Sequence, residues 1–236
     1  MMTNSPADRS TTDWRDNTTW YMHETPIARL VRFLGKHVFN ILTRVERVGL
    51  DNIPTSGPCI VAANHIHNLD VIYLGSTIPR YPHFMAKKEL YKNPLFGWFI
   101  RQLGSFPVNR GARDAWAVRH AGKILDEGLL LFMFPEGTRN RKAQLRKGKP
   151  GAVRLALEHK AMIVPTAITG TNKVRWGLNR PSRIKMEFAA PLDVVKIAGQ
   201  PPYSPDTYRE LTNLLMQTIA AMLPPENRGV YGNQSD

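Results

Sequence analysis

Two residues in the first third of the chain, His65 and Asp70, have types and a spacing that suit acid–base catalysis. They follow a short apolar segment, 59–63, at a place where a strand is expected to turn into a helix. A carboxylate at the start of that helix can reach back to one imidazole nitrogen, which leaves the other nitrogen to take a proton from a hydroxyl. No serine or cysteine obviously pairs with His65 as a nucleophile, so we expect the hydroxyl to belong to a substrate. The alternative is a packed histidine with a purely structural hydrogen bond.

A second group of residues has the chemistry of an anion site. The segment Glu136-Gly137-Thr138-Arg139 follows an apolar run at 129–134, and Arg110 follows an extended stretch. Arginines at the ends of two strands can bind a phosphate through paired N–H groups. Glu136 is expected to orient an arginine or a substrate hydroxyl. The alternative is a surface turn with a salt bridge, which contributes little energy.

Strands alternating with helices must position these residues. Apolar or alternating segments predict strands at 59–63, 83–86, 105–108, 129–134, 162–168 and 183–188. Helical patterns and caps predict helices at 71–78, 93–103, 113–127, 151–160 and 206–223. The expected fold class is therefore α/β, with a largely parallel twisted sheet flanked by helices. In such a sheet ligands bind beyond the carboxyl ends of the strands, where both groups of residues are expected to lie.

The expected organisation has four parts. Residues 1–25 read as a flexible polar lead-in, 26–44 as a basic amphipathic helix, 45–225 as the catalytic domain and 226–236 as a flexible tail. The helix has two interpretations: its apolar face docks on the domain's own core, or it lies in a membrane interface with its basic face toward anionic headgroups.

Composition excludes several classes of protein. The 236 residues carry a net charge of +13, concentrated between residues 27 and 185, which predicts an anionic partner: nucleic acid, anionic lipid or a phosphorylated substrate. One cysteine, Cys59, excludes an intrachain disulfide and a cysteine-based zinc site. No secretory signal and no apolar run long enough to span a bilayer is recognisable, so a soluble or peripheral protein is expected.

Four sequence blocks, taken in order, resemble those of the lysophospholipid acyltransferase family. The Asn-His-x4-Asp motif is complete at 64–70, and Phe-Pro-Glu-Gly-Thr-Arg stands unchanged at 134–139. The stretch 104–110 matches the second motif loosely, with Pro107 in place of an aliphatic residue, and Val-Pro at 164–165 matches the fourth. Lys87 falls on the lysine of an upstream element of the family. The resemblance covers about residues 45–190.

The resemblance implies an enzyme that moves a fatty acyl group from an acyl thioester, on CoA or acyl carrier protein, to the free hydroxyl of lysophosphatidic acid. His65 would deprotonate that hydroxyl and Asp70 would orient the ring. The implied substrate-binding residues are Arg110, Glu136, Gly137, Thr138, Arg139 and Lys87. No cofactor and no metal are required, and the implied location is peripheral, on the cytoplasmic side of a membrane with an anionic surface.

Three alternatives remain at this stage. The acceptor could be glycerol 3-phosphate, another lysophospholipid or a lyso-aminolipid. A metal hydrolase could use His65, His67 and Asp70, although no second cluster completes its site. A basic nucleic-acid-binding module would account for the charge, but aromatic residues do not alternate with basic ones as a stacking platform requires, so no nucleic-acid partner is expected.

Overall fold

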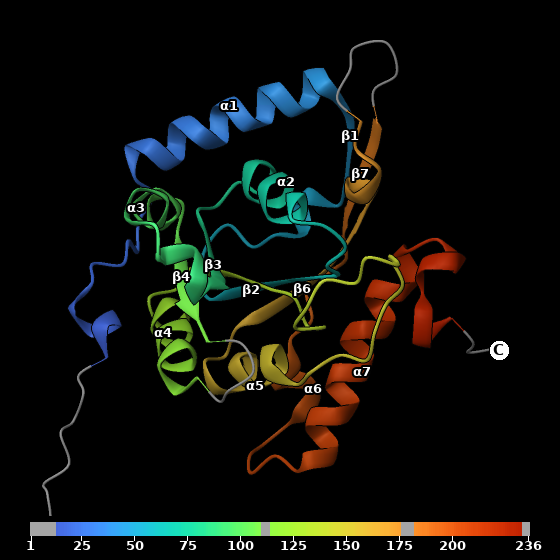
Figure 1. Cartoon of the computed structure of the whole chain (residues 1–236). Helices are drawn as coiled ribbons and strands as arrows, with labels where there is room; N and C mark the ends of the chain where they lie inside the picture. The colour runs from blue at the N-terminus through green and yellow to red at the C-terminus, as the bar shows by residue number, and fades with distance from the viewer. Residues whose placement is uncertain (1–12, 110–113, 176–181, 233–236) are drawn as a thin grey trace, which may run out of the picture.

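A seven-stranded sheet forms the centre of the computed structural model, which describes residues 13–109, 114–175 and 182–232 (Figure 1). The strand order is β1-β7-β6-β2-β5-β3-β4. Neighbouring strands pair in parallel except β6 and β7, which are antiparallel. The strands are β1 (Thr43–Val48), β2 (Cys59–Ala63), β3 (Pro82–Lys87), β4 (Ser105–Val108), β5 (Leu130–Met133), β6 (Met162–Thr169) and β7 (Ser182–Phe188). The expected α/β fold with a largely parallel sheet is confirmed.

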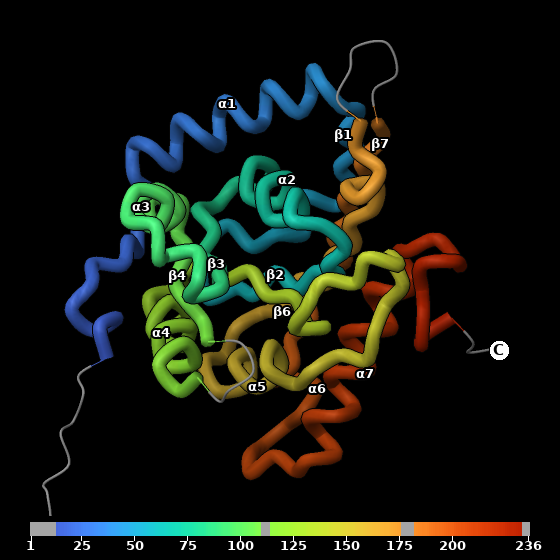
Figure 2. Tube along the Cα trace, in the orientation of Figure 1, coloured from blue at the N-terminus to red at the C-terminus, as the bar shows by residue number. Residues whose placement is uncertain are grey.

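Helices cover both faces of this sheet (Figures 1 and 2). α1 and α2 lie on one face, α4, α5, α6 and α7 lie on the other, and α3 sits at the β4 edge. Their bounds are α1 (Pro26–Leu42), α2 (Leu69–Thr77), α3 (Pro94–Gln102), α4 (Ala115–Asp126), α5 (Gly151–Glu158), α6 (Val194–Ala198) and α7 (Pro205–Met222). All five residues of β2 are buried, because a central parallel strand is covered on both faces.

Capping residues fix where several helices begin. The side chain of Asn93 accepts a hydrogen bond from Phe96 N–H ahead of Pro94, and Asp114 caps α4 through Ala117 N–H. Each cap satisfies a backbone donor that the first helical turn leaves unpaired. The predicted starts of the helices therefore lie close to the observed ones.

Helix α1 runs along α2, and the face of α1 that packs against the domain is narrow. Gly35 allows a close approach, since a Cβ there would lie 3.3 Å from Ser76 Cβ. Phe39 packs on Tyr73 with ring centroids 4.4 Å apart. Arg32, one of the basic residues of this helix, turns inward and donates to the carbonyls of Gly75, Ile78 and Arg80. The outward face carries the exposed apolar residues Leu30, Phe33, Leu34, Val38 and Ile41.

The end of the predicted 26–44 helix needs a correction. The helix ends at Leu42, because β1 begins at Thr43 and pairs in parallel with β7. This strand was not predicted. Its residues alternate in burial at the edge of the sheet, and its partner lies well over a hundred residues away in the chain.

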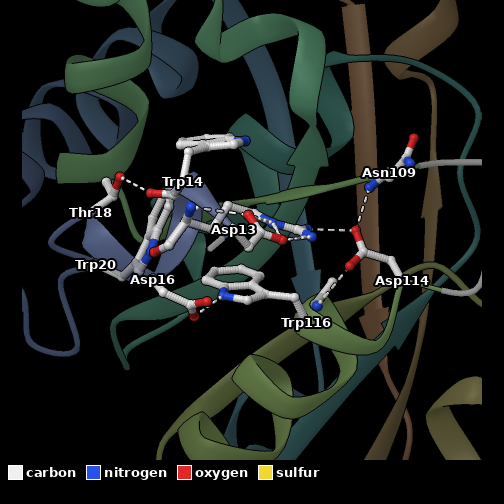
Figure 3. Close-up of polar contacts among 10 residues, drawn as sticks. Asp13, Trp14, Asp16, Thr18, Trp20, Asn109, Asp114 and Trp116 are labelled. Carbon is white, nitrogen blue, oxygen red and sulfur yellow. Dashed lines mark hydrogen bonds and ion pairs between the residues drawn. The ribbon is translucent and has the colours of Figure 1, made fainter. Parts of the chain in front are cut away.

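Both expected flexible ends are also corrected. From Asp13 onward the lead-in is folded: Trp14–Asn17 form a 3-10 helix, and Arg15 pairs with Asp114 at 2.6 Å (Figure 3). Trp116 Nε1 donates to Asp16 at 2.8 Å, and Trp20 packs edge-on against the same indole. Burial of aromatic rings and ion pairing hold this segment on α4.

The C-terminal segment is folded as far as Gly232. It contains two 3-10 helices, Pro225–Asn227 and Gly229–Tyr231. The backbone N–H of Leu145 donates to Asn227 O at 2.9 Å, and Gly148 N–H donates to the Tyr231 hydroxyl at 3.1 Å. The segment therefore fastens the loop between β5 and α5 and is not a free tail over these residues.

Candidate active site

His65 and Asp70 meet at the carboxyl end of β2, as their spacing predicts. Asp70 lies in the first turn of α2, and its Oδ2 atom is 2.8 Å from His65 Nδ1. The same oxygen accepts the backbone N–H groups of Ile66 at 2.8 Å and His67 at 2.9 Å. Both partners are buried, with Asp70 fully so. With Nδ1–H donating to the carboxylate, Nε2 is the ring nitrogen that can accept a proton.

Thr171 completes the surroundings of Asp70, a role that no motif or spacing in the sequence indicated. Its hydroxyl donates to Asp70 Oδ1 at 2.5 Å from a residue 101 positions along the chain. The turn after β6 makes this possible through Gly170, whose φ is +88°. A Cβ at Gly170 would lie 2.1 Å from Arg183 O, so only glycine fits there. The carboxylate thus has four donors, which together fix its position.

Glu136 holds the backbone around His65. It is 4% exposed, and its Oε1 accepts the His65 N–H while its Oε2 accepts the Arg146 N–H, both at 3.1 Å. Burial raises the pKa of Glu136, and the two N–H groups partly offset that effect. We expected Glu136 to orient an arginine side chain or a substrate hydroxyl. Its described hydrogen bonds instead go to backbone groups, so the geometry gives it a positioning role.

The first residue of the Asn-His-x4-Asp motif also holds the site together. Asn64 Nδ2 donates to Ile168 O at 2.9 Å, and Asn64 Oδ1 accepts Ile168 N–H at 2.7 Å. This side chain continues the pairing of β2 with β6 beyond the point where β2 ends. The carbonyl of His65 accepts Asn140 N–H at 2.8 Å, so the turn that carries His65 is also fixed from the loop after β5.

An apolar cavity of about 240 Å³ opens beside the His65 ring. The ring stacks on Phe134, with centroids 3.9 Å apart and planes 17° from parallel. Most of the wall comes from strands β3, β4 and β5 and from the start of α5: Phe84, Met85, Val108, Phe132, Met133, Phe134, Pro135, Gly137, Gly151 and Ala152. Lys149 brings a positive charge to the lining.

Lys149 is a candidate binding residue that the sequence did not single out. Gly137 has a φ of +74°, and a Cβ there would lie 3.0 Å from Lys149 Nζ. The absence of a side chain at Gly137 therefore leaves room for the lysine. The backbone N–H of Lys149 donates to Pro135 O at 2.8 Å, which holds together the two ends of the loop between β5 and α5. The lysine was visible only as one of several basic residues between 139 and 149.

Of the remaining predicted binding residues, those that the structure describes lie outside the cavity lining. Thr138 is exposed and Arg139 is half-buried on the loop after β5, while Lys87 is exposed at the carboxyl end of β3. β3 and β5 are neighbours in the sheet, so these side chains belong to the same edge as His65. Arg110 lies outside the described residues. Asp114 accepts the Asn109 N–H at 2.7 Å and also caps α4, so it ties together the two sides of the connection to which Arg110 belongs (Figure 3).

The metal-hydrolase alternative gains no support from the geometry. His67 is exposed, and its Nδ1 accepts the Leu69 N–H at 3.3 Å. Among residues 13–109, 114–175 and 182–232, no three His, Cys, Asp or Glu side chains gather where they could hold a metal ion.

Comparisons with known proteins agree on one family. The model of the family described as Acyltransferase matches residues 44–169. A 1-acyl-sn-glycerol-3-phosphate acyltransferase from Bacillus subtilis is 31% identical over 186 residues, which cover 78% of this chain and 90% of that protein. A Streptococcus pneumoniae protein of the same name is 35% identical over 150 residues, covering 62% of this chain and 55% of that one.

A solved structure resembles the fold as well. The crystal structure of the 1-acyl-sn-glycerophosphate (LPA) acyltransferase PlsC from Thermotoga maritima superposes with a TM-score of 0.64 at 25% sequence identity. The match covers 80% of this chain and 76% of that one, so it extends well beyond the motif-bearing strands.

Proposed function

The chain belongs to the acyltransferase family, and we propose that it transfers a fatty acyl group from an acyl thioester to lysophosphatidic acid, forming phosphatidic acid in phospholipid biosynthesis. One observation carries the proposal: a buried histidine–aspartate pair faces an apolar cavity at the carboxyl edge of the sheet. The names of the relatives supply the substrate. Family membership also favours an enzyme over the nucleic-acid-binding module that the charge allowed.

His65 acts as the general base in this proposal. Nε2 takes the proton of the acceptor's glycerol hydroxyl while the hydroxyl oxygen attacks the thioester carbonyl carbon. The tetrahedral oxyanion then collapses, the C–S bond breaks, and the leaving thiolate takes the proton back from the imidazolium. Asp70 stabilises the imidazolium and is itself held by its four donors. No covalent intermediate on the enzyme is needed.

The cations at this edge bind the phosphate of the acceptor. Arg139 and Lys149 come from the loop that also supplies Gly137 and Thr138, and Lys87 comes from the neighbouring strand β3. Arg110 is assigned the same role from its place in the second motif. Arginine suits the phosphate through paired N–H groups, whereas a lysine contributes a point charge. The developing oxyanion needs donors nearby, and Lys87 or backbone N–H groups can serve.

The apolar walls of the cavity suit the acyl chain. Phe84, Met85 and Val108 present hydrocarbon and aromatic surface that gains free energy when an alkyl chain displaces water. His65 lines the same cavity, so an acyl chain bound there can bring its carbonyl carbon near the ring. The donor is acyl-CoA or acyl carrier protein, and neither metal nor further cofactor enters the reaction.

A peripheral position on the cytoplasmic face of the membrane fits the same chemistry. Within the part of the chain that the structure describes, no helix combines the length and hydropathy needed to cross a bilayer. The outward face of α1 exposes Leu30, Phe33 and Ile41, and Arg29 and Lys36 lie at its flank. Such a face suits insertion among anionic headgroups. In flotation with anionic liposomes, the full chain should bind better than a chain that lacks residues 1–44, and equal binding would exclude this role.

A thiol-release assay tests the proposed reaction. Acyl-CoA is offered with lysophosphatidic acid, glycerol 3-phosphate, another lysophospholipid and a lyso-aminolipid, because these acceptors remain the alternatives. We expect lysophosphatidic acid to be preferred and His65→Ala to lower kcat by about 100-fold or more, the usual contribution of a general base. Asp70→Asn should lower kcat as well, because it removes the negative charge that stabilises the imidazolium.

The matched control is a second histidine–aspartate pair away from the cavity. His159 Nδ1 lies 2.6 Å from Asp126 Oδ1 at the end of α5. His159→Ala should leave kcat within about twofold of the wild type, as is usual for a surface change away from the chemistry. Equal losses for His65→Ala and His159→Ala would show that the assay reports folding and would remove the case for His65 as the base.

A further inference from the structure

A corner of the molecule exposes several apolar side chains next to the candidate active site. We call residues 88–98 the α3 corner; it consists of the 3-10 helix Lys88–Tyr91 and the first half of α3. Its exposed apolar residues are Leu90 (43% exposed), Leu95 (75%), Phe96 (45%) and Trp98 (41%). Solvent-exposed groups of large apolar side chains of this kind commonly mark interaction surfaces.

The exposure is built into the fold and does not come from a loose loop. The inner side of α3 is fixed by Gly97, whose close approach would place a Cβ 3.1 Å from Tyr91 Cα. The helix start is fixed by the Asn93 cap and by Pro94. With Gly97 and Ile100 facing inward, Leu95 stands on the outward side of a rigid helix.

The polar residues of the corner have the sign that an anionic surface requires. Lys88 and Lys92 of the corner, and Lys87 directly before it, are exposed around the apolar side chains, against a single acidic residue, Glu89. Lysines can lay their alkyl stems on an apolar layer and keep their charges at the headgroups.

Aromatic residues extend the same surface onto the N-terminal segment. Trp14 is half-exposed, and together with Tyr91 and Trp98 it lines a shallow hollow of about 180 Å³. Tryptophan and tyrosine are the side chains that collect at membrane–water interfaces. The combination of apolar, aromatic and cationic residues therefore favours a lipid leaflet over an acidic protein as the occupant.

The corner adjoins both the cavity and α1. It begins where β3 ends, and Phe84 and Met85 of β3 line the cavity beside His65. Helix α3 continues from the corner to Gln102, where it meets the start of α1 (Figure 1). There the Thr25 hydroxyl donates to Gln102 O at 3.0 Å. A lipid layer against the corner would therefore lie close to the cavity.

We propose that the α3 corner is a second membrane contact, separate from the outward face of α1, and that it docks on an anionic lipid leaflet beside the cavity. The inference deepens the proposed function, because it states how a lipid acceptor reaches the site. Neither α1 alone nor the basic loop after β5 accounts for apolar side chains at this corner.

A fluorescent label placed on the corner tests the contact directly. Cys59 is fully buried and is the only cysteine, so a cysteine introduced on the surface can be labelled selectively. Leu95→Cys reports the corner, Leu30→Cys reports α1, and Val230→Cys, 67% exposed on the C-terminal segment, is the control. Each full-length variant carries an environment-sensitive fluorophore and is mixed with vesicles of phosphatidylglycerol and phosphatidylcholine.

We expect the label at residue 95 to shift to the blue and to be quenched by lipids that carry a quencher in the acyl chain. The label at residue 230 should not respond. Leu95→Glu should weaken vesicle binding by roughly tenfold or more, since it puts a charge in place of apolar area that the lipid layer would bury. Activity toward a dispersed short-chain lysolipid should stay within about twofold, because Leu95 does not line the cavity.

The other outcomes separate the two proposals. A response at residue 30 without one at residue 95 would overturn the second contact and leave the proposed reaction intact. A response at residue 95 to acyl carrier protein but not to vesicles would also overturn it, since the corner would then be a protein-docking surface. If the wild type released no thiol with any lysolipid, the proposed function would fail, whereas the fluorescence result would stand on its own.

Discussion

Replacing Glu136 with glutamine separates a role in holding the backbone from a role in binding substrate. The two carboxylate oxygens accept the His65 and Arg146 N–H groups, each at 3.1 Å, in a side chain that is 4% exposed. Glutamine has nearly the same shape but keeps only one acceptor oxygen, and its amide group must face the second N–H.

The magnitude follows from these two bonds. Loss of one charge-assisted hydrogen bond costs about 1.5–3 kcal/mol, and a buried N–H left without an acceptor costs about 1–3 kcal/mol more. Burial raises the pKa of Glu136, so the charged carboxylate carries a desolvation cost that glutamine removes. We therefore expect Glu136→Gln to lower the free energy of unfolding by about 2–4 kcal/mol, with a lower kcat because the His65 turn loosens.

Urea unfolding at pH 7.5, together with the thiol-release assay, measures both effects. The control is Glu158→Gln, an exposed glutamate at the end of α5, which should change the free energy of unfolding by less than about 0.5 kcal/mol. If Glu136→Gln were as stable as the control and only raised the KM for lysophosphatidic acid, the backbone role would be refuted. The direct substrate contact that the sequence suggested would then be correct.

Three further changes probe other features. Thr171→Val removes the hydroxyl donor to Asp70 and should lower the free energy of unfolding, measured in urea, by about 1.5–3 kcal/mol. Thr171→Ser keeps a hydroxyl and should retain most of the wild-type stability. Equal stability of the wild type and both variants would exclude the hydrogen bond as a contributor. Gly137→Ala forces a side chain into a φ of +74° and against Lys149, so a loss of about 1–2 kcal/mol is expected in thermal unfolding, and a neutral result would show that the turn can relax. Burial lowers the pKa of His120 to about 4, below its unfolded value of about 6.5, so its contribution to stability is intact above pH 6.5 and is lost as the pH falls toward 4. Between pH 7.5 and pH 5, the free energy of unfolding of His120→Phe should therefore fall by about 1–2 kcal/mol less than that of the wild type, after allowance for partial exposure. Urea unfolding at the two pH values measures this difference, and an equal fall in both proteins would contradict the assignment.

The sequence was sufficient to predict the structure where the local residue pattern and the fold agree. The apolar run at 59–63, the turn at 64–68 and the helix after it follow from burial, turn chemistry and capping, so the meeting of His65 with Asp70 could be predicted. The parallel sheet then places the loop after β5 at the same edge without any further information.

Roles that depend on distant contacts could not be predicted. Glu136 looked like a substrate-binding residue, because carboxylates in loops often bind substrates. The fold shows that its oxygens accept the backbone N–H groups of His65 and Arg146. Thr171 reaches Asp70 across 101 residues, and no spacing rule connects them. Residues 13–25 read as a polar lead-in because their tryptophans have no helical or strand period, yet the Trp20 ring packs on Trp116 and Trp14 packs on Trp20.

The junction between α1 and the sheet has a mechanical consequence. Helix α1 ends at Leu42 and β1 begins at Thr43, so no linker separates them. The Thr43 hydroxyl donates to Phe39 O at 2.6 Å and lies 3.1 Å from the Tyr73 hydroxyl, while Arg32 fastens the other half of the helix to the end of α2. The helix cannot swivel independently of the strands. Any support on which α1 rests therefore sets the tilt of the whole sheet, and with it the direction in which the His65 cavity opens.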